Sequence, residues 1–178
     1  MNTVKKPILS FDLRSATAQD AEFLYRLYST TRMDELNAAG FPEDEREQFL
    51  RMQFDLQNTH YERFYPGAED RIIITAASDD NGGDDKCAGA AAGTAIGREY
   101  VYLSEDEILL VDIALLPEFC GKGIGTVLLE KLCRESARTG KPLKLYALKF
   151  NNRVLRLYER FGFNIIDDTG VYYLLEWR

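Results

Sequence analysis

The sequence predicts a single mixed α/β domain, and two observations carry this prediction. Apolar runs rich in β-branched residues are interspersed with segments whose apolar residues recur at helical spacing. One strand-like run, at residues 107–116, leads through a glycine-rich turn directly into an apolar helix. The length of 178 residues suits one domain with a substantial core. We therefore expect one domain over residues 1–178.

The first part of the chain predicts a strand, two helices and a second strand. Residues 8–14 alternate apolar and polar side chains as a half-buried strand does, and residues 15–20 supply turn and capping residues. Helices are expected at residues 18–30 and at residues 42–57, the second of which starts at a proline. Residues 71–77 are rich in β-branched side chains and predict a strand.

The second part predicts five strands and two helices after a polar loop. Clustered Asp, Asn and Gly at residues 78–89 indicate a solvated loop, without the ligand spacing of a calcium site. Strands are expected at residues 94–103, 107–116, 143–149, 163–168 and 171–177, and helices at residues 123–139 and 151–160. The predicted order is therefore β-α-α-β-β-β-α-β-α-β-β.

Composition narrows the range of functions. A net charge of −7 argues against a nucleic-acid partner, which would need a basic surface. The chain has no apolar run long enough for a membrane span, and its N-terminus lacks the apolar core of a signal peptide, so we expect no membrane partner and a cytoplasmic location. Three cysteines and one histidine offer little material for a metal site, and no metal is expected.

The turn after the strand at residues 107–116 has the features of an anion site. The first N–H groups of a helix have no partners within the helix, and they carry a partial positive charge. Gly121, Gly123 and Gly125 remove side chains that would keep a ligand away, and Lys122 adds a cation. The spacing matches neither the dinucleotide fingerprint nor the Walker loop.

Two segments resemble the GCN5-related N-acetyltransferase (GNAT) superfamily. The G-K-G-I-G of residues 121–125 resembles its acetyl-CoA signature, [Q/R]-x-x-G-x-[G/A], with Cys120 where Gln or Arg is usual. This position works largely through its backbone N–H, so binding should survive the change. The NNRVLRLYERFGF of residues 151–163 resembles a second GNAT segment, N-x-x-A-x-x-L-Y-x-x-x-G-F. The N-terminal half also resembles a bacterial subgroup whose substrates are mostly unassigned.

The resemblance implies a fold and a donor. The fold is a central, twisted, mostly antiparallel mixed sheet flanked by helices, with acceptor-side helices in residues 5–70 and an acetyl-CoA-binding core in residues 88–178. Acetyl-CoA is the implied co-substrate. The residues expected to bind it are Ile113, Ala114 and Leu115 through the backbone along pantetheine, Cys120, Gly121, Lys122, Gly123, Ile124, Gly125 and Thr126 at the pyrophosphate, and Asn151 and Tyr158.

Acetyl transfer to an amine calls for a base and benefits from an acid at the leaving sulfur. Tyr158 occupies the position of the GNAT tyrosine that faces the sulfur, and helical spacing places it on one face with Asn151; the alternative is a tyrosine packed in the core. Asp112 and Glu107 are candidate bases, and in a regular strand they face opposite sides. A buried Asp112 that only accepts backbone hydrogen bonds is an equal alternative.

The acceptor is less constrained than the donor. After the first predicted helix, Asp34 and Glu35 would suit an ammonium group, whereas Arg32 would orient a carboxylate. The leading hypothesis is an N-acetyltransferase that moves acetyl to a primary amine of a small molecule, by direct attack in a ternary complex. Alternatives are a protein or peptide N-acetyltransferase and a non-catalytic acyl-CoA-binding module. Either a monomer or a homodimer is compatible with the sequence.

Overall fold

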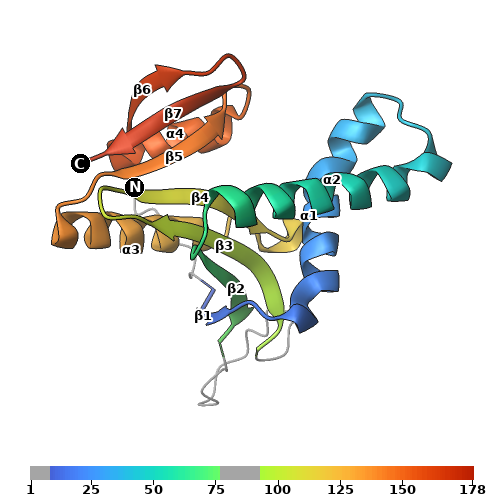
Figure 1. Ribbon diagram of the computed structural model, residues 1–178, viewed down its shortest axis with the longest axis horizontal. Helices are drawn as coiled ribbons and strands as arrows, with labels where there is room; N and C mark the ends of the chain where they lie inside the picture. The colour runs from blue at the N-terminus through green and yellow to red at the C-terminus, as the bar shows by residue number, and fades with distance from the viewer. Residues whose placement is uncertain (1–8, 77–92) are drawn as a thin grey trace, which may run out of the picture. The chain divides into compact units, whose positions relative to one another are not determined.

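The computed structural model describes residues 9–76 and 93–178, except for the side chains of Asp34 and Glu35. The loop expected at residues 78–89 lies outside these residues. Within the described residues, seven strands form a sheet in the order β1-β2-β3-β4-β5-β7-β6 (Figure 1). β4 and β5 are parallel, whereas β1–β2, β5–β7 and β6–β7 are antiparallel.

The elements follow the order that the sequence predicts. The strands are β1 (Phe11–Ser15), β2 (Glu69–Thr75), β3 (Ala95–Leu103), β4 (Ile108–Leu115), β5 (Leu143–Leu148), β6 (Asn164–Asp168) and β7 (Tyr172–Trp177). The helices are α1 (Ala21–Ala38), α2 (Glu43–Phe64), α3 (Ile124–Thr139) and α4 (Asn152–Phe161), with short 3-10 turns η1 (Ala18–Asp20) and η2 (Pro117–Phe119). The predicted mixed α/β class, with a mostly antiparallel sheet flanked by helices, is confirmed.

Helices α1 and α2 are longer than the sequence predicts. The expected end of the first helix lies at threonines, but their hydroxyls bond back to carbonyls one turn earlier: Thr30 Oγ1 to Leu27 O at 2.8 Å and Thr31 Oγ1 to Tyr28 O at 2.7 Å. The helix therefore continues past them to Ala38. No helix in the described part of the chain is both long and apolar enough to cross a membrane.

The chain divides into two compact units. The first comprises Met1–Pro66, Asp70–Glu99 and Ala114–Ile124 as far as they are described, and the second comprises Gly67–Glu69, Tyr100–Ile113 and Gly125–Arg178. The core of the second unit is built from α3, α4, β5 and β7 around Leu129, Leu145, Tyr158 and Leu175. In the first unit, Phe54 of α2 packs against Tyr25 and Tyr28 of α1, with ring centroids 5.8 and 5.6 Å apart.

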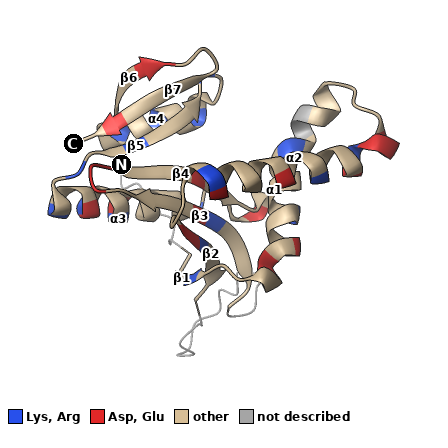
Figure 2. Cartoon of the chain, in the orientation of Figure 1, with Lys and Arg blue, Asp and Glu red and all other residues tan. Residues whose placement is uncertain are grey.

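Charged residues of both signs lie on β2 and β3 in the first unit (Figure 2), and two ion pairs join these strands. Arg98 donates to both carboxylate oxygens of Asp70 at 2.8 and 2.9 Å, and Arg71 donates to Glu99 at 3.1 Å. Arg98 and Glu99 are 5% and 1% exposed, so each charge is buried beside a partner of opposite sign. Removing one partner of such a pair is strongly destabilising, because the other charge stays buried and uncompensated.

The start of the first helical segment is held by a charged cap. Asp20 accepts hydrogen bonds from the backbone N–H and the hydroxyl of Thr17 and a two-pronged contact from Arg14 at 2.6 and 2.8 Å. The hydrogen bond from Arg14 is the largest cause that holds the pKa of the Asp20 carboxyl well below its usual range. Since the folded state favours the ionised carboxylate, this cap stabilises the fold above the unfolded pKa of about 4 and less as the pH falls.

Replacing Asp20 by Asn should therefore lower the free energy of unfolding by about 0.5–2 kcal/mol at pH 7, the range for losing a capping side chain. Urea unfolding of both proteins between pH 7 and pH 3 measures this difference. It should shrink at pH 3, where the unfolded Asp20 is already protonated. The exposed Asp12 of β1 provides the control, and Asp12→Asn should leave stability nearly unchanged. A difference for Asp20→Asn that is equal at both pH values would contradict the charged cap.

Candidate functional site

Strands β4 and β5 pair over only part of their length. Their parallel register runs from Ile108 opposite Leu143 to Leu110 opposite Leu145 and ends there, although β4 continues to Leu115 and β5 to Leu148. On its other edge β5 is paired with β7 over its whole length, from Leu143 opposite Trp177 to Leu148 opposite Tyr172. The end of β4 thus has backbone N–H and C=O groups on its β5-facing edge that β5 does not bind, as at an exposed sheet edge. This segment contains the residues expected to lie along pantetheine.

The turn between β4 and α3 depends on glycine. Gly121 and Gly123 have φ angles of 75° and 85°, in the left-handed region that side chains disfavour. Gly125 lies in the first turn of α3, and a Cβ built on it would meet no heavy atom within 4 Å. Ile124 between them is 0% exposed and fixes the start of the helix in the core. The helix N-terminus therefore has open space at Gly125.

The charges around this turn favour an anion. The first turn of α3, all of it described, has no acidic residue. Lys122 lies with its Nζ 5.0 Å from the centroid of the Phe119 ring, a cation–π contact that orients the ammonium group. Cys120 is exposed, and its Sγ lies 3.7 Å from the carbonyl of Leu115. The turn thus combines helix N–H groups with a cationic residue two positions before the helix begins.

Gly97 of β3 is a positioning residue that the motif analysis did not find. A Cβ at this position would lie 2.4 Å from the carbonyl oxygen of Ala114 and 2.7 Å from a side-chain carbon of Leu115. Only glycine lets the backbone of β3 approach β4 this closely. Gly97 therefore helps to set the path of the β4 segment expected along pantetheine. The sequence signal was an isolated glycine within a strand pattern, which indicates a close backbone approach.

Tyr158 is buried in the second unit at 6% exposure, with its ring 5.5 Å from that of Phe163. Burial, and then the negative charge of Asp112, raise the pKa of Tyr158 to about 12. The phenol is therefore protonated at neutral pH. Asp112 is half-buried on β4. The structure thus brings Tyr158 and Asp112, two of the three predicted catalytic residues, within electrostatic reach of each other.

Glu107, the third predicted catalytic residue, lies in a different environment. It precedes β4 in the turn closed by Ser104, whose hydroxyl accepts its backbone N–H at 3.0 Å. Its carboxylate forms an ion pair with Lys144 of β5 at 2.7 Å. The hydrogen bond from this pair is the main reason that the pKa of Lys144 is raised. Glu107 thus has a cationic partner already, and its role as a base stays a prediction.

Asn151 forms the N-cap of α4. Its side-chain oxygen accepts the backbone N–H of Val154 at 3.2 Å, which satisfies one of the N–H groups at the helix start. This contact fixes the beginning of α4, the helix that places Tyr158 in the core. The structure therefore assigns Asn151 a structural role, and its contact with acetyl-CoA stays a prediction.

In α1, Arg32 lies over the ring of Tyr28, with its guanidinium carbon 5.6 Å from the ring centroid. The side chains of Asp34 and Glu35, the candidate ammonium partners, lie outside the described residues. Among the residues that are described, no three His, Cys, Asp or Glu side chains are grouped so that they would hold a metal ion.

Comparison with known proteins places this geometry in a family. Residues 21–163 match the model of the acetyltransferase (GNAT) family. A segment of 68 residues is 37% identical to the ribosomal protein bS18-alanine N-acetyltransferase of Haemophilus influenzae. That match covers 38% of this chain and 47% of the length of that enzyme.

Solved structures share the fold over nearly the whole chain. The PaiA N-acetyltransferase of Thermoplasma acidophilum, in complex with coenzyme A, superposes with a TM-score of 0.64 at 19% identity, covering 96% of this chain and 99% of that one. A GNAT family acetyltransferase of Elizabethkingia anophelis, with acetyl-CoA bound, has a TM-score of 0.57 at 15% identity and covers 95% and 98% of the two chains. The family predicted from the two motifs is confirmed: the chain belongs to the GNAT family of acetyltransferases.

Proposed function

We propose that the protein transfers the acetyl group of acetyl-CoA to a primary amine of a small molecule, by direct attack in a ternary complex. Binding of acetyl-CoA is supported by the end of β4–β5 pairing at Leu110, followed by the glycine turn at the start of α3. Together these features leave a strand edge and a helix N-terminus available in one continuous segment.

Backbone groups supply most of the donor contacts in this proposal. The pantetheine arm, which carries two amides, pairs with the edge of β4 at Ile113, Ala114 and Leu115 as a strand would. The pyrophosphate accepts hydrogen bonds from N–H groups of residues 120–126, and Lys122 offsets part of its charge. Solved structures that share the fold include proteins with coenzyme A or acetyl-CoA bound, which supports this choice of donor.

The reaction requires one base and a way to stabilise the leaving sulfur. The amine nitrogen attacks the thioester carbonyl carbon, a C–N bond forms and the C–S bond breaks, and the proton lost by nitrogen is returned to sulfur as coenzyme A leaves. We assign the base to Asp112, because its charge acts on Tyr158, the residue that we assign to the sulfur. Tyr158 is the hydrogen-bond donor to the sulfur.

The pKa of about 12 constrains how Tyr158 acts. An ordinary thiol has a pKa of about 8.5, so full proton transfer from such a phenol to a thiolate would be uphill by about 5 kcal/mol. Burial penalises both anions, whereas the charge of Asp112 opposes the phenolate in particular. When Asp112 takes the amine proton, that charge is neutralised and Tyr158 becomes a stronger acid. Tyr158 thus donates a hydrogen bond first and its proton after the amine has reacted.

A protein N-terminus is the second candidate acceptor. It is favoured by the 37% identity over 68 residues to an enzyme that acetylates alanine of ribosomal protein bS18. The chemistry at Asp112 and Tyr158 would be the same, since an α-amine of a protein is also a primary amine. The two kinds of acceptor differ only in the size of the molecule that the acceptor site must admit. Activity measured with a panel of small amines and of peptides therefore distinguishes between them.

Gly125 allows donor binding to be tested apart from folding. Gly125→Ala should leave the melting temperature equal or higher, because alanine favours a helix by about 1 kcal/mol over glycine and its Cβ meets no protein atom. The affinity for acetyl-CoA, measured by titration calorimetry, should fall at least about tenfold, because the methyl group occupies the ligand's space.

Ala137→Gly on the same helix is the matched control, since it makes the reverse change at an exposed position. It should lower stability by about 1 kcal/mol and leave the affinity for acetyl-CoA unchanged. Unaltered affinity in Gly125→Ala would rule out the helix N-terminus as the pyrophosphate site.

The function itself is tested by release of the free thiol from acetyl-CoA with a panel of amines, comprising amino acids, polyamines, aminoglycosides and short peptides. Tyr158→Phe should lower kcat about 10²–10⁴-fold, the usual range for losing a positioned acid, with the affinity for acetyl-CoA within about twofold of the original. With a pKa of about 12, Tyr158 should cause no loss of rate on the alkaline side below pH 10.

Tyr172→Phe, on the exposed part of β7, serves as the control and should leave kcat unchanged. Release of thiol with no amine in the panel would defeat the proposed function, and turnover of peptides alone would select the second acceptor. A kcat for Tyr158→Phe equal to that of the unaltered enzyme would show that this tyrosine only packs in the core.

A further inference from the structure

Helix α2 has a buried face and an exposed apolar face. Its buried residues are Leu50 and Phe54, and the ring of Phe54 packs against α1 within the first unit. Met52 and Leu56 are 49% and 57% exposed, although both side chains are apolar. Single exposed apolar residues are common on protein surfaces, whereas a row of them along one helix face is typical of an interaction surface.

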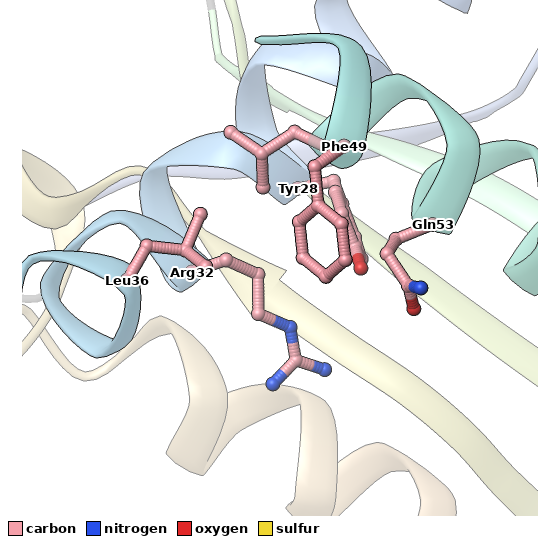
Figure 3. A pocket seen from close by; sticks show the side chains of 6 residues that line it. Tyr28, Arg32, Leu36, Phe49 and Gln53 are labelled. Carbon is pink, nitrogen blue, oxygen red and sulfur yellow. The ribbon is translucent and has the colours of Figure 1, made fainter. Parts of the chain in front are cut away.

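The exposed face of α2 follows a heptad repeat. Residues that recur at alternating steps of four and three form one stripe along a helix. This α2 stripe consists of Glu45, Phe49, Met52, Leu56, Thr59 and Arg63. Phe49 borders it toward α1, where Phe49 and Gln53 line part of a pocket of about 220 Å³ between the two helices (Figure 3). The stripe is thus apolar over most of its middle and charged at both ends.

The two ends of the α2 stripe carry opposite charges. Glu45 lies in the acidic first turn of α2, which is red in Figure 2, and Arg63 is the basic residue of the last turn. Both side chains are exposed. They are 18 residues apart, which is about 27 Å along a helix, so they cannot pair with each other within one chain.

The α2 stripe is complementary to itself when two copies run antiparallel. A twofold axis brings the same patch of both copies together, so each layer of contacts occurs twice. The layers are Glu45 with Arg63 of the second copy, Phe49 with its Thr59, and Met52 with its Leu56. A parallel pair would instead place Glu45 beside Glu45 and Arg63 beside Arg63, with like ends of the two helix dipoles together. The charges therefore favour the antiparallel pair.

We propose that the protein forms a homodimer through α2, in which the α2 stripe of one copy packs antiparallel on that of a second copy. Met52 and Leu56 lie at the centre and supply the apolar burial. The two ion pairs lie at the rim, where charges determine direction and register more than affinity. One pair of helices buries less than the standard interface of about 1,600 Å², so we expect a weak, reversible dimer.

Analytical ultracentrifugation of the full chain over a series of concentrations, up to the millimolar range, tests the proposal. The original protein should pass from monomer to a species of twice its mass. Leu56→Glu should abolish the dimer, because it places a carboxylate in each copy at the centre of the apolar contact. Glu45→Arg and Arg63→Glu should each raise the dissociation constant about tenfold or more, because two ion pairs become two like-charge contacts.

The double variant Glu45→Arg with Arg63→Glu is the decisive one. It restores opposite charges across the antiparallel pair, so its dissociation constant should return close to the original value. The distance between the two positions within one chain excludes an intramolecular cause of this rescue.

Glu62→Arg provides the matched control, since it makes the same charge change as Glu45→Arg at an exposed residue outside the α2 stripe. It should leave the dissociation constant unchanged, and melting temperatures of all variants check that they are folded. A protein that stays monomeric over the whole series would overturn the proposal. So would a dimer that none of the variants weakens, or one that the double variant does not restore.

Discussion

The junction between β4 and α3 depends on main-chain groups of β4 that β5 does not bind. β4 continues for several residues beyond its pairing with β5, and the turn that follows has two glycines with positive φ angles. A ligand bound here meets N–H groups in fixed positions, so little ordering is needed when it binds. We therefore expect the site to tolerate Cys120 where the GNAT signature has Gln or Arg, since the expected contact there is made by the backbone.

The buried charges of the first unit hold β3 where this junction needs it. Three consecutive residues of β3 make different contacts. Gly97 lies against Ala114, whereas Arg98 pairs with Asp70 and Glu99 with Arg71, both of β2. A shift of β3 by one residue would separate both ion pairs and place a side chain where only Gly97 fits. Ion pairs of this kind define a register more than they stabilise a fold. The close approach to Ala114 is thus secured from the opposite edge of β3.

Sequence reasoning predicted the elements and their order because periodicity and turn residues are local signals. It ended both α1 and α2 too early. In α1 the reason is that hydroxyls such as that of Thr30 bond back within a helix and do not end it. The glycine turn was predicted from the residues themselves. The end of β4–β5 pairing could not be predicted in this way, because pairing depends on two strands that are distant in the sequence. Arg98 and Glu99 were missed for a related reason: a charged residue in a strand suggests an exposed position, and the partners that allow burial lie on another strand.

The most direct measurement of donor binding is amide hydrogen exchange, followed by mass spectrometry with and without acetyl-CoA. If the main chain of this junction binds the donor, acetyl-CoA should slow exchange in peptides that cover residues 111–128, and coenzyme A without the acetyl group should protect the same turn. Peptides from β6 and β7 should exchange at unchanged rates. Protection that is absent from residues 111–128, or that appears only elsewhere in the chain, would contradict a donor site built from the end of β4 and the start of α3.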